Sequence, residues 1–233
     1  MEISEEARDR FYKEVSIHLT REGFSVLEQR DGLLPLEWCG APLCRITAGG
    51  GAQFRREDLE REGAEEAFCR ATDIAHTTAE YMRLMESSPP LRANGLDGDY
   101  RMLADFNGTV LAGHPTTQGV QFVTWEWDYE HTGMWQGHYY GNNYPGAKQD
   151  FAIRAGLIPK ELILEQSELD ELYRCCQRTR ELDGTLSYFA EQKLIHLQEH
   201  LEVLSPGIGE RYAVLESPVG PETQFEQTMY PSL

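Results

Sequence analysis

The sequence has few positive charges and no long apolar run. Its 21 lysine and arginine residues stand against 39 aspartate and glutamate residues, which gives a formal net charge of −18. Nucleic acids and anionic membrane surfaces both bind clustered basic side chains, so this balance argues against either as a direct partner. No stretch approaches the roughly 20 apolar residues of a membrane-spanning helix, and the acidic N-terminus lacks the pattern of a signal peptide. We therefore expect a cytoplasmic protein.

Cysteine is scarce, and five residues is an odd number. In a chain without an export signal, this usage favours reduced thiols over disulfides. Cys39 and Cys44 lack the second pair of ligands that a zinc site needs. The triple glycine at 49–51 lacks the Gly-Lys-Ser/Thr of a phosphate-binding loop. The sequence therefore predicts no cofactor.

Hydrophobic periodicity predicts an α+β fold with a central antiparallel β-meander of about four strands, N-terminal edge strands and flanking amphipathic helices. Apolar residues repeat at helical spacing between Ser4 and Gly23 and again over 58–85. Asn107-Gly108 is typical of a tight turn between two strands, 101–106 and 109–114.

Composition marks only a weak boundary between two parts of the chain. A polar link after the paired prolines at 89–90 separates an N-terminal layer over 1–90 from a sheet and C-terminal helices over 91–205. We expect these two parts to form one compact unit. Residues 206–233 contain four prolines and little periodicity, so we expect an extended or partly disordered tail.

Residues 119–141 hold three of the four tryptophans and read as a hairpin. A turn at 131–133 would pair Glu130 with Met134 and place Trp127 opposite Gly137. Alternation then puts one set of side chains in the core, namely Val123, Trp125, Trp127 and Tyr129. The other face would be solvated, with Glu126 opposite His138 and with Asp128 beside them.

Glu126, Asp128 and His138 are the candidate catalytic residues. A carboxylate facing an imidazole can transfer protons or hold a divalent cation. Equally, a Glu–His pair across two strands is a common solvated contact that contributes little energy. Since no nucleophile or oxyanion donor accompanies the three residues, a protein without enzymatic activity is the favoured interpretation.

The segment from His196 to His200 matches the H-x-x-E-H pattern of one class of zinc protease. Two histidines four residues apart on a helix can share a metal. The apolar stripe of this helix runs through Leu186, Ala190, Leu194, Leu197, Leu201 and Leu204, and we expect it to face inward. His200 would then lie at its margin and His196 in solvent, so surface histidines are favoured over a metal site.

Acidic residues concentrate in the C-terminal part, where 161–233 has a formal charge of −9. Net charge commonly keeps proteins soluble, but some acidic proteins space carboxylates to imitate a nucleic-acid backbone. The residues that we expect to contact a partner are Glu165, Glu168, Asp170, Glu171, Glu181, Asp183, Glu191, Glu199 and Glu202.

The stretch GNNYPGAKQDFAIRAGLI at 141–158, and the helical region around Tyr173-Arg174-Cys175-Cys176, carry a resemblance. Both are similar to accessory proteins encoded on conjugative elements and phages of gut Firmicutes. The resemblance covers the C-terminal half and implies no catalytic residues. It implies a mobile genetic element, whose accessory genes often counter host restriction or CRISPR systems.

These observations lead to one principal hypothesis with two alternatives. The principal hypothesis is a non-enzymatic acidic inhibitor of a basic nucleic-acid-handling effector, of anti-restriction or anti-CRISPR type, which could act as a DNA mimic. The first alternative is a small hydrolase or metal-dependent enzyme that uses Glu126, Asp128 and His138. The second is an interaction module of conjugative or phage machinery.

Overall fold

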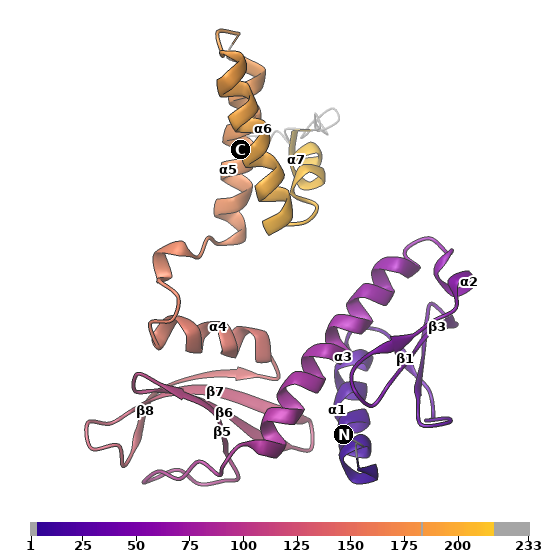
Figure 1. Ribbon diagram of the computed structural model, residues 1–233, viewed down its shortest axis with the longest axis vertical. Helices are drawn as coiled ribbons and strands as arrows, with labels where there is room; N and C mark the ends of the chain where they lie inside the picture. The colour runs from indigo at the N-terminus through magenta and orange to yellow at the C-terminus, as the bar shows by residue number, and fades with distance from the viewer. Residues whose placement is uncertain (1–3, 183, 217–233) are drawn as a thin grey trace, which may run out of the picture. The chain divides into compact units, whose positions relative to one another are not determined.

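The computed structural model describes residues 4–182 and 184–216 (Figure 1). They form helices and two antiparallel four-stranded sheets, so the predicted α+β class is confirmed. The chain divides into two compact units, Met1–Pro159 and Lys160–Leu233. Among the described residues, no helix combines the length and the apolar character needed to cross a bilayer.

The N-terminal strands form a sheet of their own, whereas the sequence suggested that they lie at the edge of the central meander. Its strand order is β1 (Ser25–Val26), β2 (Leu34–Trp38), β3 (Ala41–Ile46) and β4 (Ala52–Gln53). The helix α1 (Glu5–Arg21) precedes the sheet and begins where the sequence predicts. The hydroxyl of Ser4 accepts a hydrogen bond from a backbone N–H in the first turn.

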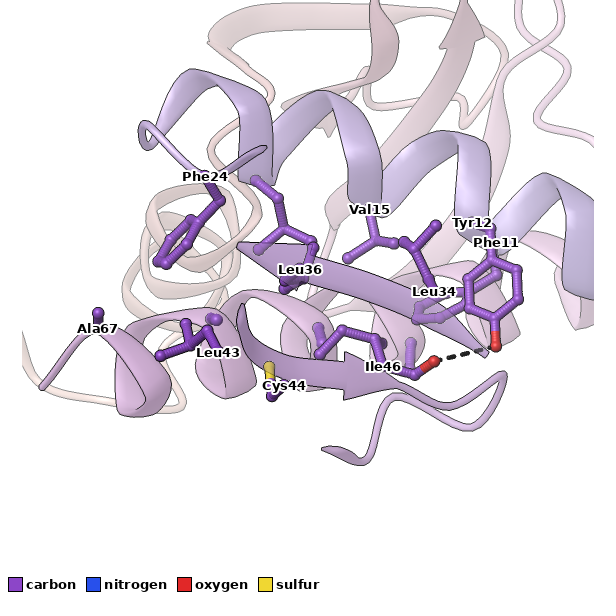
Figure 2. Close-up of a cluster of buried hydrophobic side chains, with 14 of the residues drawn as sticks. Phe11, Tyr12, Val15, Phe24, Leu34, Leu36, Leu43, Cys44, Ile46 and Ala67 are labelled. Atoms are coloured by element: carbon purple, nitrogen blue, oxygen red, sulfur yellow. Dashed lines mark hydrogen bonds between the residues drawn. The ribbon is translucent and has the colours of Figure 1, made fainter. Parts of the chain in front are cut away.

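The first core lies between this sheet and the helices α1 and α3, of which α3 spans Ala64–Ser87 (Figure 2). Leu36 and Ile46 project from the strands and Val15 projects from α1, and all three are fully buried. Each such side chain stabilises the fold by about 1.5–3 kcal/mol. The hydroxyl of Tyr12 donates to the backbone carbonyl of Ile46 at 3.1 Å, which satisfies a polar group inside this core.

The helix α3 (Ala64–Ser87) follows the short α2 (Arg56–Leu59) and serves both sheets. Its first half presents alanines to the first core, and their small side chains allow close approach of the backbone around Gly50. A Cβ at Gly50 would meet the Cβ of Ala79 at 2.6 Å. After Ala79, the buried Tyr81 belongs to the core of the second sheet. One continuous helix thereby connects the two cores.

The second sheet is the predicted meander of four antiparallel strands. Its order is β5 (Arg101–Phe106), β6 (Thr109–Thr116), β7 (Gly119–Trp127) and β8 (Met134–Gly141). The turn at Asn107-Gly108 has positive φ at both residues, 50° and 79°, as a two-residue hairpin turn requires.

Both faces of the second sheet are covered. On one face, Phe122 packs against Tyr144 and Phe151 of α4 (Tyr144–Arg154). On the other face, Val123 and Trp125 pack with Leu91 from the segment between α3 and β5. The sequence analysis treated the first of these faces as solvated, because it could not show that α4 folds back over the strands.

The hairpin of β7 and β8 has a different register from the predicted one. Trp127 pairs with Met134, Glu126 with Trp135 and Thr124 with His138, and the connecting loop spans 128–133. An irregularity near Gln136, which has φ of 49°, adds one residue to β8 and restores the predicted faces beyond it. The predicted burial of Trp125 is therefore correct, and its ring rather than that of Trp127 lies against Gly137.

Tyr129 is the clear error in the predicted core. It lies in the loop instead of in a longer β7 and is fully exposed. Trp135 is also exposed. The strand β7 ends at Trp127, two residues earlier than the alternation suggests, and a six-residue loop follows. Strand alternation therefore does not predict on which side the ring of Tyr129 lies.

The unit Lys160–Leu233 is helical where it is described. After a short 3₁₀ helix (Lys160–Leu162), α5 (Gln166–Leu182) and α6 (Tyr188–Leu204) form an antiparallel pair, and α7 (Ile208–Glu216) follows. The core of this unit contains Leu169, Tyr173, Leu201 and Ile208. The helix α7 corrects the prediction of an extended tail over 206–216; the rest of that tail lies outside the described residues.

Candidate functional site

Glu126 and His138 lie on the face of the second sheet that α4 covers, and each contacts a side chain of that helix. The carboxylate of Glu126 forms an ion pair with Arg154 at 3.0 Å. The Nδ1 atom of His138 lies 3.2 Å from the carboxylate of Asp150. Asp150 and Arg154 are one helical turn apart, so both reach the sheet from the same side of α4. Neither residue was predicted from the sequence, because their spacing resembles an ordinary surface ion pair.

Arg154 holds α4 on the sheet. Its side chain is only 10% exposed, and its guanidinium donates to the backbone carbonyls of Thr124 and Gln136 as well as to Glu126. The Gln136 carbonyl belongs to the irregular part of β8, where the strand ladder is interrupted. Arg154 therefore supplies donors that the sheet itself does not provide, which is a structural role.

The pair of His138 and Asp150 is the one arrangement here with the geometry of acid–base chemistry. A carboxylate that accepts from one imidazole nitrogen orients the ring. The side chain of His138 is 54% exposed, so a reactant could reach it. The neighbouring hydroxyl of Thr124 is fully buried and donates to Asp150, so it is not placed as a nucleophile.

Asp128 is not part of this arrangement. It lies at the start of the loop 128–133, where its carboxylate accepts hydrogen bonds from the backbone N–H and the hydroxyl of Thr132. The backbone N–H of Thr132 is the largest influence that lowers the pKa of Asp128 below its usual value. The three predicted residues thus divide into Glu126 and His138 beneath α4, and Asp128 in a turn that it stabilises.

Metal binding finds no support in the described part of the chain, where no group of three or more His, Cys, Asp or Glu residues is placed to hold an ion. The rings of His196 and His200 lie 4.2 Å apart on α6. His196 also lies 3.7 Å from Glu199. All three side chains are on the exposed surface of the helix, as the sequence analysis expected for the two histidines.

The predicted partner-binding carboxylates lie on α5, on α6 and just before α5, and most already have contacts within the unit. Asp170 pairs with Arg211 at 3.0 Å, and Glu202 accepts from the hydroxyl of Tyr173. The others with such contacts are Glu168, Glu171, Glu181 and Glu199. Among the described residues, no partner reaches the carboxylates of Glu165 and Glu191, and Asp183 lies outside them.

Large apolar side chains are exposed on the same unit, which the sequence analysis did not anticipate. The stripe on α6 was expected to face inward, but only Leu201 of its leucines is buried. Leu204 is 67% exposed and Leu197 is 44% exposed. Phe189, which is 70% exposed, lies on this side too, with the ammonium of Lys193 over its ring at 4.7 Å. We call Phe189, Leu197 and Leu204 the α6 stripe.

The way α6 packs on α5 explains this exposure. Gln198 is buried between the two helices, accepts from Arg180 and donates to Gln177. The buried residues of α6 are Gln198 and Leu201, and Leu197 and Leu204 lie one turn before and after Leu201, at the exposed border of this contact. A polar residue in the contact was the available signal that the leucines of this helix are not all core.

No family model and no curated protein matches this chain. Its function must therefore be argued from its own residues.

Proposed function

We propose that this protein is a non-enzymatic binding protein whose helical unit docks on a basic nucleic-acid-handling effector and inhibits it. An effector of a restriction or CRISPR system is the target class that we favour. The observation that carries the proposal is the α6 stripe, an exposed row of large apolar side chains on a unit with a strongly acidic surface. Exposed apolar rows bordered by charge are typical of protein-binding surfaces.

Two kinds of contact would contribute to binding in different ways. The α6 stripe would supply most of the affinity, because buried aromatic and aliphatic side chains dominate binding energy at interfaces. The carboxylates around it would steer a basic partner and select against acidic ones. Glu165 and Glu191 are the best placed for this, since neither carboxylate has a partner to give up among the residues that the structure describes.

The proposal is tested by measuring how the full-length protein binds purified restriction and CRISPR effectors over a range of salt concentrations. In a complex found this way, Leu197→Gln and Leu204→Gln should each weaken binding about tenfold. The matched control is Phe106→Gln, which changes an exposed apolar residue of the other unit. If the control weakens binding as much as the two leucine variants do, the α6 stripe is not the docking surface.

Charge is tested separately by reversing Glu165 and Glu191 together to lysine. This change should slow association and flatten the dependence of affinity on salt. Its control is the double reversal Glu22→Lys and Asp73→Lys, which adds the same charge at two exposed acids of the other unit. If binding depends neither on salt nor on the reversal of Glu165 and Glu191, electrostatic mimicry of nucleic acid is excluded. An interaction module of transfer machinery would then be the better interpretation if the leucine variants still weaken binding.

The enzymatic alternative now depends on two residues, His138 and Asp150. It is distinguished by screening hydrolase activities with the wild-type protein and with His138→Ala. An activity that disappears in this variant, while binding to the effector is retained, would establish the enzyme instead of the inhibitor.

A further inference from the structure

A second feature of the molecule, independent of the helical unit, is a cleft of about 600 Å³ between α1, α3 and the second sheet. We call it the α1–α3 cleft. Its apolar lining includes Ile17 of α1, Met82 and Met85 of α3, and Val120 of β7. The volume lies within the usual range for small-ligand sites. Methionine side chains adapt to aromatic ligands because they are flexible and polarizable.

The rim of the cleft is basic, in contrast to the rest of the chain. Arg10, Lys13 and Arg101 line it, with Glu86 as the exposed acid among them. Arg10 pairs with Glu86 at 2.8 Å, and Arg101 donates to a backbone carbonyl. In the part of the chain that the structure describes, no partner reaches the ammonium of Lys13. A protein with almost twice as many acids as bases therefore places a cation at the edge of an apolar cleft, without a counter-charge among the described residues.

Glu14 provides the second observation. It also lines the cleft, and the residue is only 8% exposed. Its Oε1 atom accepts from the hydroxyl of Tyr81 and from the backbone N–H of Val120, both at 2.8 Å. No donor within the described residues reaches its Oε2 atom. Oε2 is not among the buried side-chain atoms that lack a partner, so it is open to solvent on a residue that lines the cleft and is free to accept a hydrogen bond from a ligand.

We propose that the α1–α3 cleft binds a small aromatic carboxylic acid that carries a hydrogen-bond donor on its ring. The carboxylate of the ligand would pair with Lys13 at the rim, the ring would lie over the two methionines, and the donor would reach Oε2 of Glu14. The cleft offers a cation, apolar surface and a hydrogen-bond acceptor, and a compound of this class carries a matching group for each. A simple fatty acid or an amine matches only part of the lining.

The test uses the full-length protein and 3-(4-hydroxyphenyl)propionate as the probe, with affinity measured by calorimetry. Removal of the ring hydroxyl, in 3-phenylpropionate, should weaken binding roughly ten- to a hundredfold, as expected for one hydrogen bond to a charged group. Replacement of the carboxylate by an amine, in tyramine, should abolish binding. If tyramine binds as well as the acid, or if no saturation occurs below about 10 mM, the proposal is wrong.

Variants locate the site. Lys13→Gln should weaken binding of the probe about fivefold or more, because it removes the cation at the rim. Arg70→Gln is the control, since it removes one exposed cation of α3 outside the cleft. In methyl spectra of the protein, the signals of Met82 and Met85 should shift with the probe, while those of the methionines at 102 and 134 should not. Equal effects of the two variants, or unshifted signals at 82 and 85, would place the probe elsewhere and overturn the assignment.

Discussion

The buried carboxylate of Glu14 offers the sharpest test of how the second sheet is attached to α1. It accepts from Tyr81 on α3 and from the N–H of Val120 on β7, so it joins three elements at one point. We consider the substitution Glu14→Gln, which keeps the shape of the side chain and removes its charge.

The magnitude follows from these two hydrogen bonds. A bond to a charged group contributes about 1.5–3 kcal/mol, against about 0.5–1.5 kcal/mol for a neutral one. Glutamine keeps an oxygen that can accept both bonds, so we expect Glu14→Gln to lower the free energy of unfolding by about 1–3 kcal/mol at pH 7. Glu14→Ala leaves both donors without a partner and should cost about 3–5 kcal/mol.

The pKa of Glu14 determines how the stability cost of Glu14→Gln changes with pH. Burial opposes ionisation of Glu14, but the neighbouring His18 ring and the hydrogen bonds from Val120 and Tyr81 outweigh it and hold the pKa of the carboxyl below its ordinary value of 4.5. A pKa that is lower in the folded state stabilises the fold fully above the unfolded-state pKa, and this contribution is lost as the pH falls through the folded-state pKa. The difference between wild type and Glu14→Gln should therefore shrink below about pH 4.5.

Urea unfolding followed by tryptophan fluorescence measures the effect in the correct unit. All four tryptophans lie within Met1–Pro159, so the signal follows that unit alone. Glu22→Gln, at an exposed acid near the end of the same helix, should change stability by less than about 0.5 kcal/mol. The reasoning is refuted if Glu14→Gln costs no more than this control at pH 7, or if its cost is the same at pH 7 and pH 4.

Three further outcomes are expected. Arg154→Met should destabilise the same unit by about 2–4 kcal/mol in urea unfolding, because it leaves two backbone carbonyls without their donor; an effect below 1 kcal/mol would contradict that role. Gly137→Ala should lower the melting temperature, because its Cβ would lie 2.5 Å from an indole nitrogen, whereas Gly49→Ala meets nothing within 4 Å and should be neutral. Under native conditions a thiol reagent should label three of the five cysteines quickly and leave Cys44 and Cys176 protected until unfolding. Burial also raises the pKa of Cys44 to about 12, which keeps its thiol unreactive. Rapid labelling of all five cysteines would contradict the buried placement of these two.

Local signals in the sequence predicted the local structure well. The serine before α1, the Asn107-Gly108 turn and the alternation around Trp125 each depend on residues close together in the chain. The error at Tyr129 arose where alternation was extended into a loop. The register error arose because a single added residue near Gln136 cannot be seen as a change in hydrophobic pattern.

The candidate site was predicted only in part, for a physical reason. Glu126 and His138 were correctly placed on one face, because strand alternation fixes that. Their partners Asp150 and Arg154 come from α4, and nothing in the spacing of these residues shows which sheet face the helix covers. Leu197 and Leu204 of α6 were expected to face the core but are exposed. An amphipathic helix has the same pattern whether its apolar face meets the protein or a partner.

By itself, the sequence determined the α+β class, the meander with its turn, the burial of Trp125 and the acidity of the helical unit. These depend on periodicity, turn chemistry and composition, which act over a few residues. Only the tertiary structure decided that the N-terminal strands form a sheet of their own, that α4 covers Glu126 and His138, and that the α6 stripe is exposed. It also brought Glu14, Tyr81 and Val120 together, because contacts between residues so far apart in the chain depend on how whole elements pack.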